Sequence, residues 1–427
     1  MRLRLPLLLL AACGSNSGLV ASLFAQPHRE HRLEAEAAYA NKDYVAARAA
    51  ITDALAVRPD APRYLHLLAA ASALAGDPRA AIDALNRIAD LGVAISLERD
   101  RDFASLQGAP EFRKVQQRFA ENRTPRGEVH PWAELPGRAG ITEGVAYRAK
   151  TGELFLGDVH NRCIWRRDQG GRVTRYSAED EELFGIFGLA LDETRRVLWA
   201  ATTAVPEMSG YTAAMKDTSG LAEFNLATSE LKRVVLLPDD GREHGLGDLV
   251  VAPDGTVYAT DSLSPVIWQL APEAEEFEIL LESPLFGSLQ GLILERRTLI
   301  VADYNNGLFR VDLDRREAKS LPTPKSTTLI GLDGLIAVPG GVVATQNGTD
   351  PQRVLHIALS PDLQSIAKVT VLASGQPELS DISLLTLVDS VPTVITRAGW
   401  EGYDPTTARA PTPRTVSILQ VPLGPAP

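Results

Sequence analysis

Four positions after residue 140 carry side-chain oxygens directly beside a glycine. They are Glu143, Asp248, Gln290 and Asp333, and each opens a short apolar segment. Carboxylate and amide oxygens are the ligands that hard divalent cations such as Ca²⁺ prefer. If the fold brings these positions together, they form an oxygen-rich pocket. Because Asp and Gly are also the commonest turn residues, the same pairs would alternatively do no more than turn the chain.

A repeated sequence pattern predicts that these positions do meet. From about Trp132 onward, a small or acidic residue, an apolar run, a turn and a second apolar run recur at a spacing of about 40–60 residues, the size of a propeller blade. The second copy carries an insertion from about Val205 to Ser219. The innermost strands are expected at Glu143–Ala146, Gly188–Leu191, Gly247–Val251, Gln290–Leu294, Asp333–Ala337 and, in a degenerate sixth copy, Ile382–Leu387.

The predicted fold class is therefore mainly β, a six-bladed β-propeller over residues 132–422. In a propeller the innermost strands converge on a central channel, so the residues that open them face one another at one mouth. The ring must close, because an open propeller leaves unpaired sheet edges. We expect the C-terminal strand Thr415–Val421 to pair near Trp132 for this purpose.

Residues 29–121 predict a small α-helical domain, and residues 122–131 a linker. Two helical segments repeat at an offset of about 34 residues and resemble tetratricopeptide repeats. The aligned pairs are Asp43 with Asp77, Ala47 with Ala81, and Ile51 with Leu85. This domain is expected to serve either as a docking surface for a protein partner or as a bundle that spaces the propeller from a membrane anchor.

Residues 1–25 are typical of an export signal. Arg2 and Arg4 precede the apolar run Leu5–Ala12, which is shorter than the ~20 residues that a membrane span needs. The sequence ending at Cys13 looks like a bacterial lipobox, which predicts a lipoprotein of the periplasm or outer membrane, bound to the membrane through a lipid anchor alone. Cleavage near Ala25 would instead give a secreted protein.

The composition excludes some partners. The net charge of −11 argues against a nucleic-acid partner, which needs a basic surface. The two cysteines, Cys13 and Cys163, predict no disulfide framework, and Cys163 lies in an apparent strand, where a buried structural thiol is expected. No Gly-x-Ser-x-Gly motif is present, so the sequence gives no support for a nucleophilic serine.

The residues around the four oxygen-bearing positions resemble the senescence-marker-protein/gluconolactonase family. The similar segments are Thr142–Gly144, Gly247–Gly255, Gln290–Leu292 and Leu332–Leu335. The resemblance implies a six-bladed propeller that holds one divalent metal in its channel and hydrolyses sugar lactones or related esters. It implies Glu143, Gln290 and Asp333 as metal ligands. Gln290 replaces the family's Asn before Gly, and Gly247 replaces its Asn before Asp.

The implied chemistry is metal-assisted hydrolysis. The cation would polarise the lactone carbonyl, while Asp333 or Asp248 accepts a proton from water. Ca²⁺ is the preferred candidate for this cation, and Zn²⁺, Mn²⁺ and Mg²⁺ are the alternatives. His244 is expected either to contact substrate, as Asp248 would, or to be an exposed loop histidine. The alternative function is a non-catalytic propeller that binds a ligand or a protein partner. Three further aspartates, Asp158, Asp261 and Asp303, end second strands and are expected to bind backbone amides.

Overall fold

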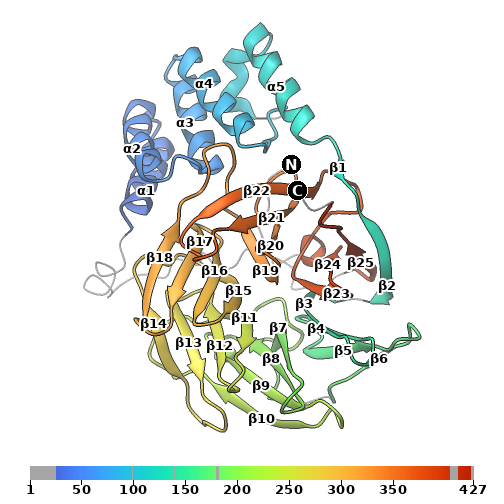
Figure 1. Cartoon of the computed structure of the whole chain (residues 1–427). Coiled ribbons are helices and arrows are strands. Elements are labelled where there is room, and N and C mark those ends of the chain that lie inside the picture. The colour runs from blue at the N-terminus through green and yellow to red at the C-terminus, as the bar shows by residue number, and fades with distance from the viewer. Residues whose placement is uncertain (1–25, 99, 139, 179–181, 404–411, 425–427) are drawn as a thin grey trace. The chain divides into compact units, whose positions relative to one another are not determined.

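The computed structural model describes residues 26–98, 100–138, 140–178, 182–403 and 412–424 (Figure 1). The predicted signal segment, the candidate lipobox at Cys13 and the cleavage site near Ala25 lie outside these residues. The chain divides into two compact units. One comprises residues 1–125, 323–330 and 349–351, and the other comprises the rest of the chain.

The first unit contains five α-helices among its described residues. Asp43 and Asp77 begin the second and fourth helices in the same way, because each carboxylate accepts a hydrogen bond from the backbone N–H three residues on. The aligned Ala47 and Ala81 are fully buried, which allows close helix packing. No described helix has the length and apolarity needed to cross a membrane. The helices are α1 (Pro27–Ala40), α2 (Tyr44–Val57), α3 (Pro62–Leu74), α4 (Pro78–Asp90) and α5 (Pro110–Asn122).

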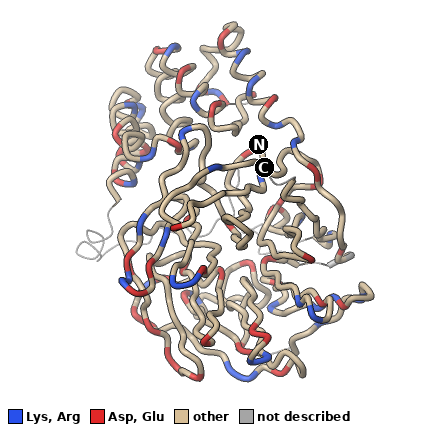
Figure 2. Tube along the Cα trace, viewed as in Figure 1, with Lys and Arg blue, Asp and Glu red and all other residues tan. Residues whose placement is uncertain are grey.

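The second unit is a six-bladed β-propeller, as the sequence predicts. Each blade is an antiparallel sheet in which successive strands pair from the inside outward. The first strand of each blade contacts the first strand of the next, and the sixth returns to the first, so these strands form a ring. Most charged residues lie on the turns and outer strands (Figure 2).

The strands of blades one to three are β3 (Thr142–Arg148), β4 (Glu153–Asp158), β5 (Cys163–Arg167), β6 (Val173–Arg175), β7 (Gly185–Asp192), β8 (Val197–Thr203), β9 (Ser219–Asn225), β10 (Leu231–Leu236), β11 (Leu246–Val251), β12 (Val257–Asp261), β13 (Val266–Leu270) and β14 (Glu278–Glu282). Those of blades four to six are β15 (Leu289–Glu295), β16 (Thr298–Asp303), β17 (Gly307–Asp312), β18 (Glu317–Leu321), β19 (Leu332–Val338), β20 (Gly341–Gln346), β21 (Arg353–Leu359), β22 (Ile366–Ser374), β23 (Leu385–Val388), β24 (Val391–Thr396) and β25 (Arg414–Gln420).

The ring closes as expected. β2 (His130–Arg138) pairs antiparallel with β25 and becomes the outer strand of blade six, so one sheet joins the two ends of the propeller. Within the segment expected to be a linker, β1 (Arg126–Gly127) pairs with β22 and extends blade five. The strand that precedes blade one and the last described strand are therefore held in one sheet, which closes the ring.

Apolar side chains fill the spaces between neighbouring blades. Between blades one and two, Phe155 and Tyr176 stack edge to face with ring centroids 5.0 Å apart, against the fully buried Leu198. Because each sheet is covered on both faces, its middle strands are continuous apolar runs, such as the run from Leu299 to Ala302 in β16. Cys163 is buried, as expected for a structural thiol.

The three repeated aspartates confirm the role that the sequence predicts for them. Asp261 accepts hydrogen bonds from the backbone amides of Gly245, Leu263 and Ser264, and Asp303 accepts four such bonds in the next blade. Asp158 does the same in blade one and also accepts from the Trp165 indole N–H. These carboxylates fix the loops between second and third strands and do not face the channel.

Candidate functional site in the propeller channel

The site residues lie where the innermost strands leave their regular pairing. In β3 the register shifts between Thr142 and Val145, and β15 and β19 shift in the same way around Gln290 and Asp333. A bulge of this kind frees residues from the ladder and redirects their side chains. Glu143, Gln290 and Asp333 are therefore positioned by the same local irregularity in three different blades.

The glycine after each of these residues is required by close packing. A Cβ atom on Gly144 would lie 1.8 Å from the Phe187 carbonyl oxygen of the next blade, and one on Gly291 would lie 2.4 Å from the Leu335 nitrogen. The Glu-Gly, Gln-Gly and Asp-Gly pairs lie inside β3, β15 and β19 rather than in turns. The alternative that these pairs only turn the chain is wrong, because their glycines let innermost strands approach each other.

Three carboxylates gather at the channel. Glu143 is 8% exposed and Asp333 is 6% exposed, while Asp248 is half-buried and lines the channel cavity. Burial raises the pKa of Glu143 to about 8, and the Asp333 carboxylate adds to this effect. Burial likewise raises the pKa of Asp248 to about 7, with Glu143 as the neighbouring negative charge. The pKa of Asp333 rises to about 7 through burial and the charge of Asp248.

Each buried carboxylate also has a neutral hydrogen-bond donor. The Trp400 indole N–H donates to Glu143 Oε2 in a short hydrogen bond, and Asn347 Nδ2 donates to Asp333 Oδ2 at 2.6 Å. Asp248 accepts from the backbone N–H of Leu249 at 2.9 Å. Among the charges that shift the three pKa values, none is a basic group. The site therefore gathers three carboxyl groups, with raised pKa values and no basic group among the described residues that shift them.

Amide oxygens complete the set of candidate ligands. Gln290 Nε2 donates to Ser288 Oγ at 3.1 Å, which fixes the orientation of the side-chain amide. Gln290 Oε1 lies 3.7 Å from where a Cβ on Gly247 would stand, so its oxygen points across to blade three. Asn347 Oδ1 is buried and forms no hydrogen bond. A buried amide oxygen without a donor loses hydration without compensation, and a bound cation would satisfy it.

These oxygens fit a hard cation in their chemistry. No three His, Cys, Asp or Glu side chains among residues 26–424, gaps excepted, are arranged to hold a metal ion by themselves. A cation at Glu143 and Asp333 would therefore need amide oxygens to complete its coordination shell. Asn347, which is hydrogen-bonded to Asp333, and Gln290 of blade four are the candidate amides.

Beyond the carboxylates, a cavity of about 220 Å³ follows the channel and is lined by all six innermost strands. Asp248, Leu249, Leu292 and Leu335 are among the residues that line this cavity. The three leucines are 5% exposed or less, so they offer little surface to a ligand. A small ligand in this space would meet the Asp248 carboxylate and other polar groups of the innermost strands.

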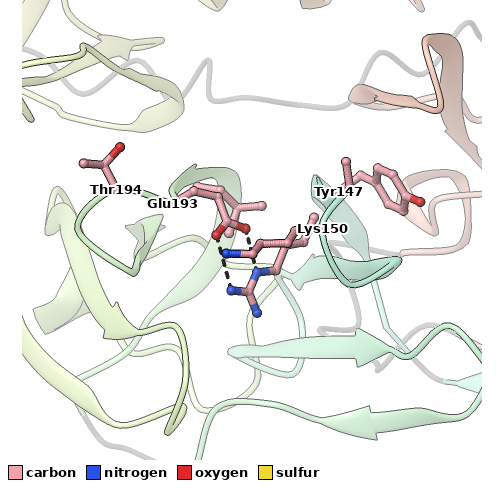
Figure 3. A pocket seen from close by; sticks show the side chains of 7 residues that line it. Tyr147, Lys150, Glu193 and Thr194 are labelled. Atoms are coloured by element: carbon pink, nitrogen blue, oxygen red, sulfur yellow. Dashed lines mark hydrogen bonds and ion pairs between the residues drawn. The ribbon is translucent and has the colours of Figure 1, made fainter.

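A second hollow of about 470 Å³ lies at the turns that follow β3 and β7 (Figure 3). Tyr147, Lys150 and Glu193 are among the residues that line it, and Arg148 Nε donates to Glu193 Oε1 at 2.6 Å across it. This ion pair joins blades one and two. None of the predicted site residues lines this hollow.

His244 is not the exposed loop histidine that one expectation describes. Its side chain is 2% exposed, so it is not an exposed loop histidine, and it does not line the channel cavity. Nδ1 lies 2.7 Å from Asp261 Oδ2 and Nε2 lies 3.1 Å from Asp240 Oδ1. Burial acts to lower the pKa of His244, but the hydrogen bonds to the two aspartates outweigh it and raise the pKa. The ring braces the loop before β11 rather than reaching a ligand, so a contact with substrate has no support in this arrangement.

Sequence reasoning missed two residues of the site. Trp400 belongs to no repeated phrase, and only the fold brings it to Glu143, 257 positions away in the chain. Asn347 directly follows β20, at the start of a loop, where its Asn-Gly-Thr sequence suggests a turn. The position of Asn347 one residue after a second strand, near the blade-five Asp-Gly pair, is the one signal that could have identified it.

The sequence matches no protein-family model and no curated protein. Solved structures are similar over the propeller. A gluconolactonase from Xanthomonas campestris is 14% identical, with 70% of this chain and 98% of that chain covered and a TM-score of 0.45. A PQQ-bound aldose sugar dehydrogenase from Streptomyces coelicolor is 14% identical, with coverage of 69% and 98% and a TM-score of 0.48. Virginiamycin B lyase from Staphylococcus aureus is 11% identical, with coverage of 69% and 99% and a TM-score of 0.45. At these identities and TM-scores the similarity assigns no activity to this chain.

Proposed function

We propose that the propeller channel binds one divalent cation, Ca²⁺ in preference to Zn²⁺, Mn²⁺ or Mg²⁺, and hydrolyses small lactones or related esters. The observation that carries the proposal is the group of three carboxylates from blades one, three and five, of which Glu143 and Asp333 are buried and Asp248 is half-buried. Burial raises the pKa of each, and the repulsion between neighbouring carboxylates adds to it; a cation would relieve this repulsion. An all-oxygen set of carboxylates and amides suits Ca²⁺.

The protein residues have distinct proposed roles. Glu143 and Asp333 would hold the cation, with Gln290 and Asn347 contributing amide oxygens. The cation would supply Lewis acidity toward the lactone carbonyl and water. Asp248 lines the channel cavity, so its carboxylate could accept a proton from the attacking water there.

A non-catalytic binding propeller is the second candidate function. It is favoured by Gly247, which presents no side chain in blade three, and by the hydrogen bonds that already engage one oxygen each of Glu143 and Asp333. In that case the channel would bind a small ligand without turnover. Export as a lipoprotein or secreted protein, and docking of a protein partner on the helical unit, are further proposals that rest on the sequence patterns alone.

Metal content and lactone hydrolysis test the proposal together. The purified protein is stripped with a chelator, titrated with Ca²⁺ in a calorimeter, and then assayed on small aliphatic and sugar lactones with and without the chelator. Glu143→Gln and Asp333→Asn should each lose cation binding and hydrolysis. Glu317→Gln, on the exposed outer strand β18, should leave both unchanged.

Each outcome has a definite reading. If Ca²⁺, Zn²⁺, Mn²⁺ and Mg²⁺ all fail to bind at millimolar concentration, the cation site and the hydrolase proposal are both refuted. If a cation binds and the two variants lose it, but no lactone or ester is hydrolysed, the binding function replaces the catalytic one.

A further inference from the structure

A segment from blade six covers the Glu143 carboxylate. This cover, residues Gly399–Tyr403, follows β24 and contains a short 3₁₀ turn that starts at Trp400. The Trp400 indole N–H donates to Glu143, and its ring lies 6.3 Å, centroid to centroid, from the ring of Phe187 in blade two. Trp400 therefore bridges Glu143 of blade one and Phe187 of blade two, at the end of the channel where the innermost strands begin.

A hydrogen bond at the far end of the cover fastens it to blade two. The Tyr403 hydroxyl donates to the Pro206 carbonyl oxygen at 2.7 Å. Pro206 belongs to the insertion between β8 and β9, whose Val205 and Met208 are 4% and 3% exposed in the same apolar cluster as Tyr403. The insertion that the sequence shows in the second copy therefore has a structural role, because it receives the end of the cover.

The near end of the cover is held by the backbone. Gly399 N donates to Asp381 Oδ2 at 2.7 Å, and the preceding Ala398 carbonyl accepts from Thr142 N at 2.8 Å. Gly399 has a φ of 118°, and a Cβ there would lie 2.3 Å from the Gly140 carbonyl oxygen, so this position needs glycine. The near end is thus tied by two hydrogen bonds, whereas Tyr403 ties the far end through its side chain.

We propose that the cover is a latch that must open before a solute reaches Glu143. Glu143 is nearly buried, and Trp400 of the cover is hydrogen-bonded to its carboxylate. Val145, Leu189 and Leu292 help to line the channel cavity, but Glu143 does not, so a solute in that cavity does not contact it. Trp400 is then a positioning residue for the Glu143 carboxylate in the closed state, and the Tyr403–Pro206 hydrogen bond sets how often the cover opens.

The latch predicts a particular change in kinetics. Removing the Tyr403 hydroxyl deletes one neutral hydrogen bond of the closed state, which should raise the open population on the order of five-fold. Ligand association and dissociation both pass through the open state, so both rates should rise by similar factors while the dissociation constant changes little. A general loss of structure would instead weaken binding and lower the melting temperature.

Hydrogen exchange of the Trp400 indole N–H tests the latch without any ligand. ¹⁵N-tryptophan labelling of the full chain gives one indole signal per tryptophan, and Trp400→Phe assigns the signal of Trp400. In Tyr403→Phe this N–H should exchange on the order of five-fold faster than in the unsubstituted protein. Tyr211→Phe is the matched control, because Tyr211 lies in the same insertion and cluster and should leave the exchange unchanged. Equal exchange in Tyr403→Phe and the unsubstituted protein would overturn the proposal.

A second arm uses Tb³⁺, a Ca²⁺ analogue whose emission a nearby tryptophan sensitises, and it rests on the proposed cation site. In stopped-flow mixing, Tyr403→Phe should speed both association and dissociation of Tb³⁺, and Tyr211→Phe should change neither. A change confined to dissociation, with weaker binding, would overturn the latch. If Tb³⁺ does not bind the unsubstituted protein at all, the cation proposal fails, and the indole exchange alone decides whether the latch exists.

Discussion

Replacement of Glu143 by Gln should stabilise the cation-free propeller at alkaline pH. In the native protein the Glu143 pKa is raised from 4.5 to about 8, chiefly by burial and by the Asp333 charge. Between these values the folded state binds more protons than the unfolded state. The free energy of unfolding therefore falls as pH rises from the unfolded pKa through the folded one. The contribution of this protonation to the free energy of unfolding is complete below about pH 4.5 and is lost as the pH rises through about 8.

The size of the effect follows from the shift. At about 1.4 kcal/mol per pKa unit, the shift of Glu143 corresponds to at most about 5 kcal/mol of destabilisation by the ionised group. Asp248 and Asp333 share the same repulsion, so a single substitution relieves only part of the total. We expect Glu143→Gln to raise the free energy of unfolding by about 2–4 kcal/mol at about pH 9, and to change it little at about pH 5. Glutamine keeps an oxygen that accepts the Trp400 N–H.

Urea unfolding monitored by tryptophan fluorescence measures the free energy of unfolding of Glu143→Gln at about pH 5 and about pH 9, with a chelator present at both pH values. All five tryptophans lie in the propeller, so the signal reports that unit. Glu223→Gln is the matched control with the opposite sign. Glu223 is also buried, but it pairs with Lys232 at 3.1 Å and Arg233 at 2.7 Å, so its neutralisation should destabilise. If Glu143→Gln is less stable than the unsubstituted protein at about pH 9, or keeps the same pH dependence, the carboxylate repulsion inferred for the channel is wrong.

Three further predictions concern the framework of the site. Gly144→Ala should lower the free energy of unfolding by about 2–4 kcal/mol, because its Cβ would collide with the Phe187 carbonyl. Gly170→Ala, in an exposed turn, should be nearly neutral. Equal free energies of unfolding for the two variants in urea would contradict this prediction. Asp261→Ala should lower the free energy of unfolding by about 3–5 kcal/mol in the same assay, because it leaves three backbone amides and the buried His244 without their acceptor. A decrease of less than about 1 kcal/mol would show that water replaces the carboxylate. Removal of residues 412–427 deletes β25 and should leave β2 and β24 without the strand that joins them. The truncated chain should therefore aggregate or unfold at a lower urea concentration. If it stays monodisperse in size-exclusion chromatography and its unfolding midpoint is unchanged, the propeller does not need this closure.

The fold was predictable because its signal is repeated. Apolar runs of the same kind recur in the blades, and four of the six blades have a glycine next to a polar residue at the start of the innermost strand, so the repeat is recognisable even where one copy is degenerate. The closing pair of β2 and β25 followed from the need to leave no open edge. The positions of Glu143, Gln290 and Asp333 on innermost strands followed from the same repeat.

The rest of the site could not be predicted because it depends on contacts that occur once. Trp400 reaches Glu143 from an irregular loop, and no periodicity marks such a residue. The expectation that His244 is exposed was wrong because its burial depends on a contact with Asp261, 17 positions away in the chain, which local sequence does not reveal. The raised pKa values likewise depend on three charges from separate blades, which local sequence does not reveal.

The pairing of β2 with β25 also constrains how the chain reaches its native state during synthesis. β2 emerges from the ribosome before any blade, but its partner β25 follows the other strands of all six blades. Blades one to five can assemble in order, each on its predecessor, while β2 lacks its partner and could join a wrong sheet. Blade six is therefore complete only after β25 has been made. Until then β2 has a free edge, and a chain that lacks β25 keeps this edge free.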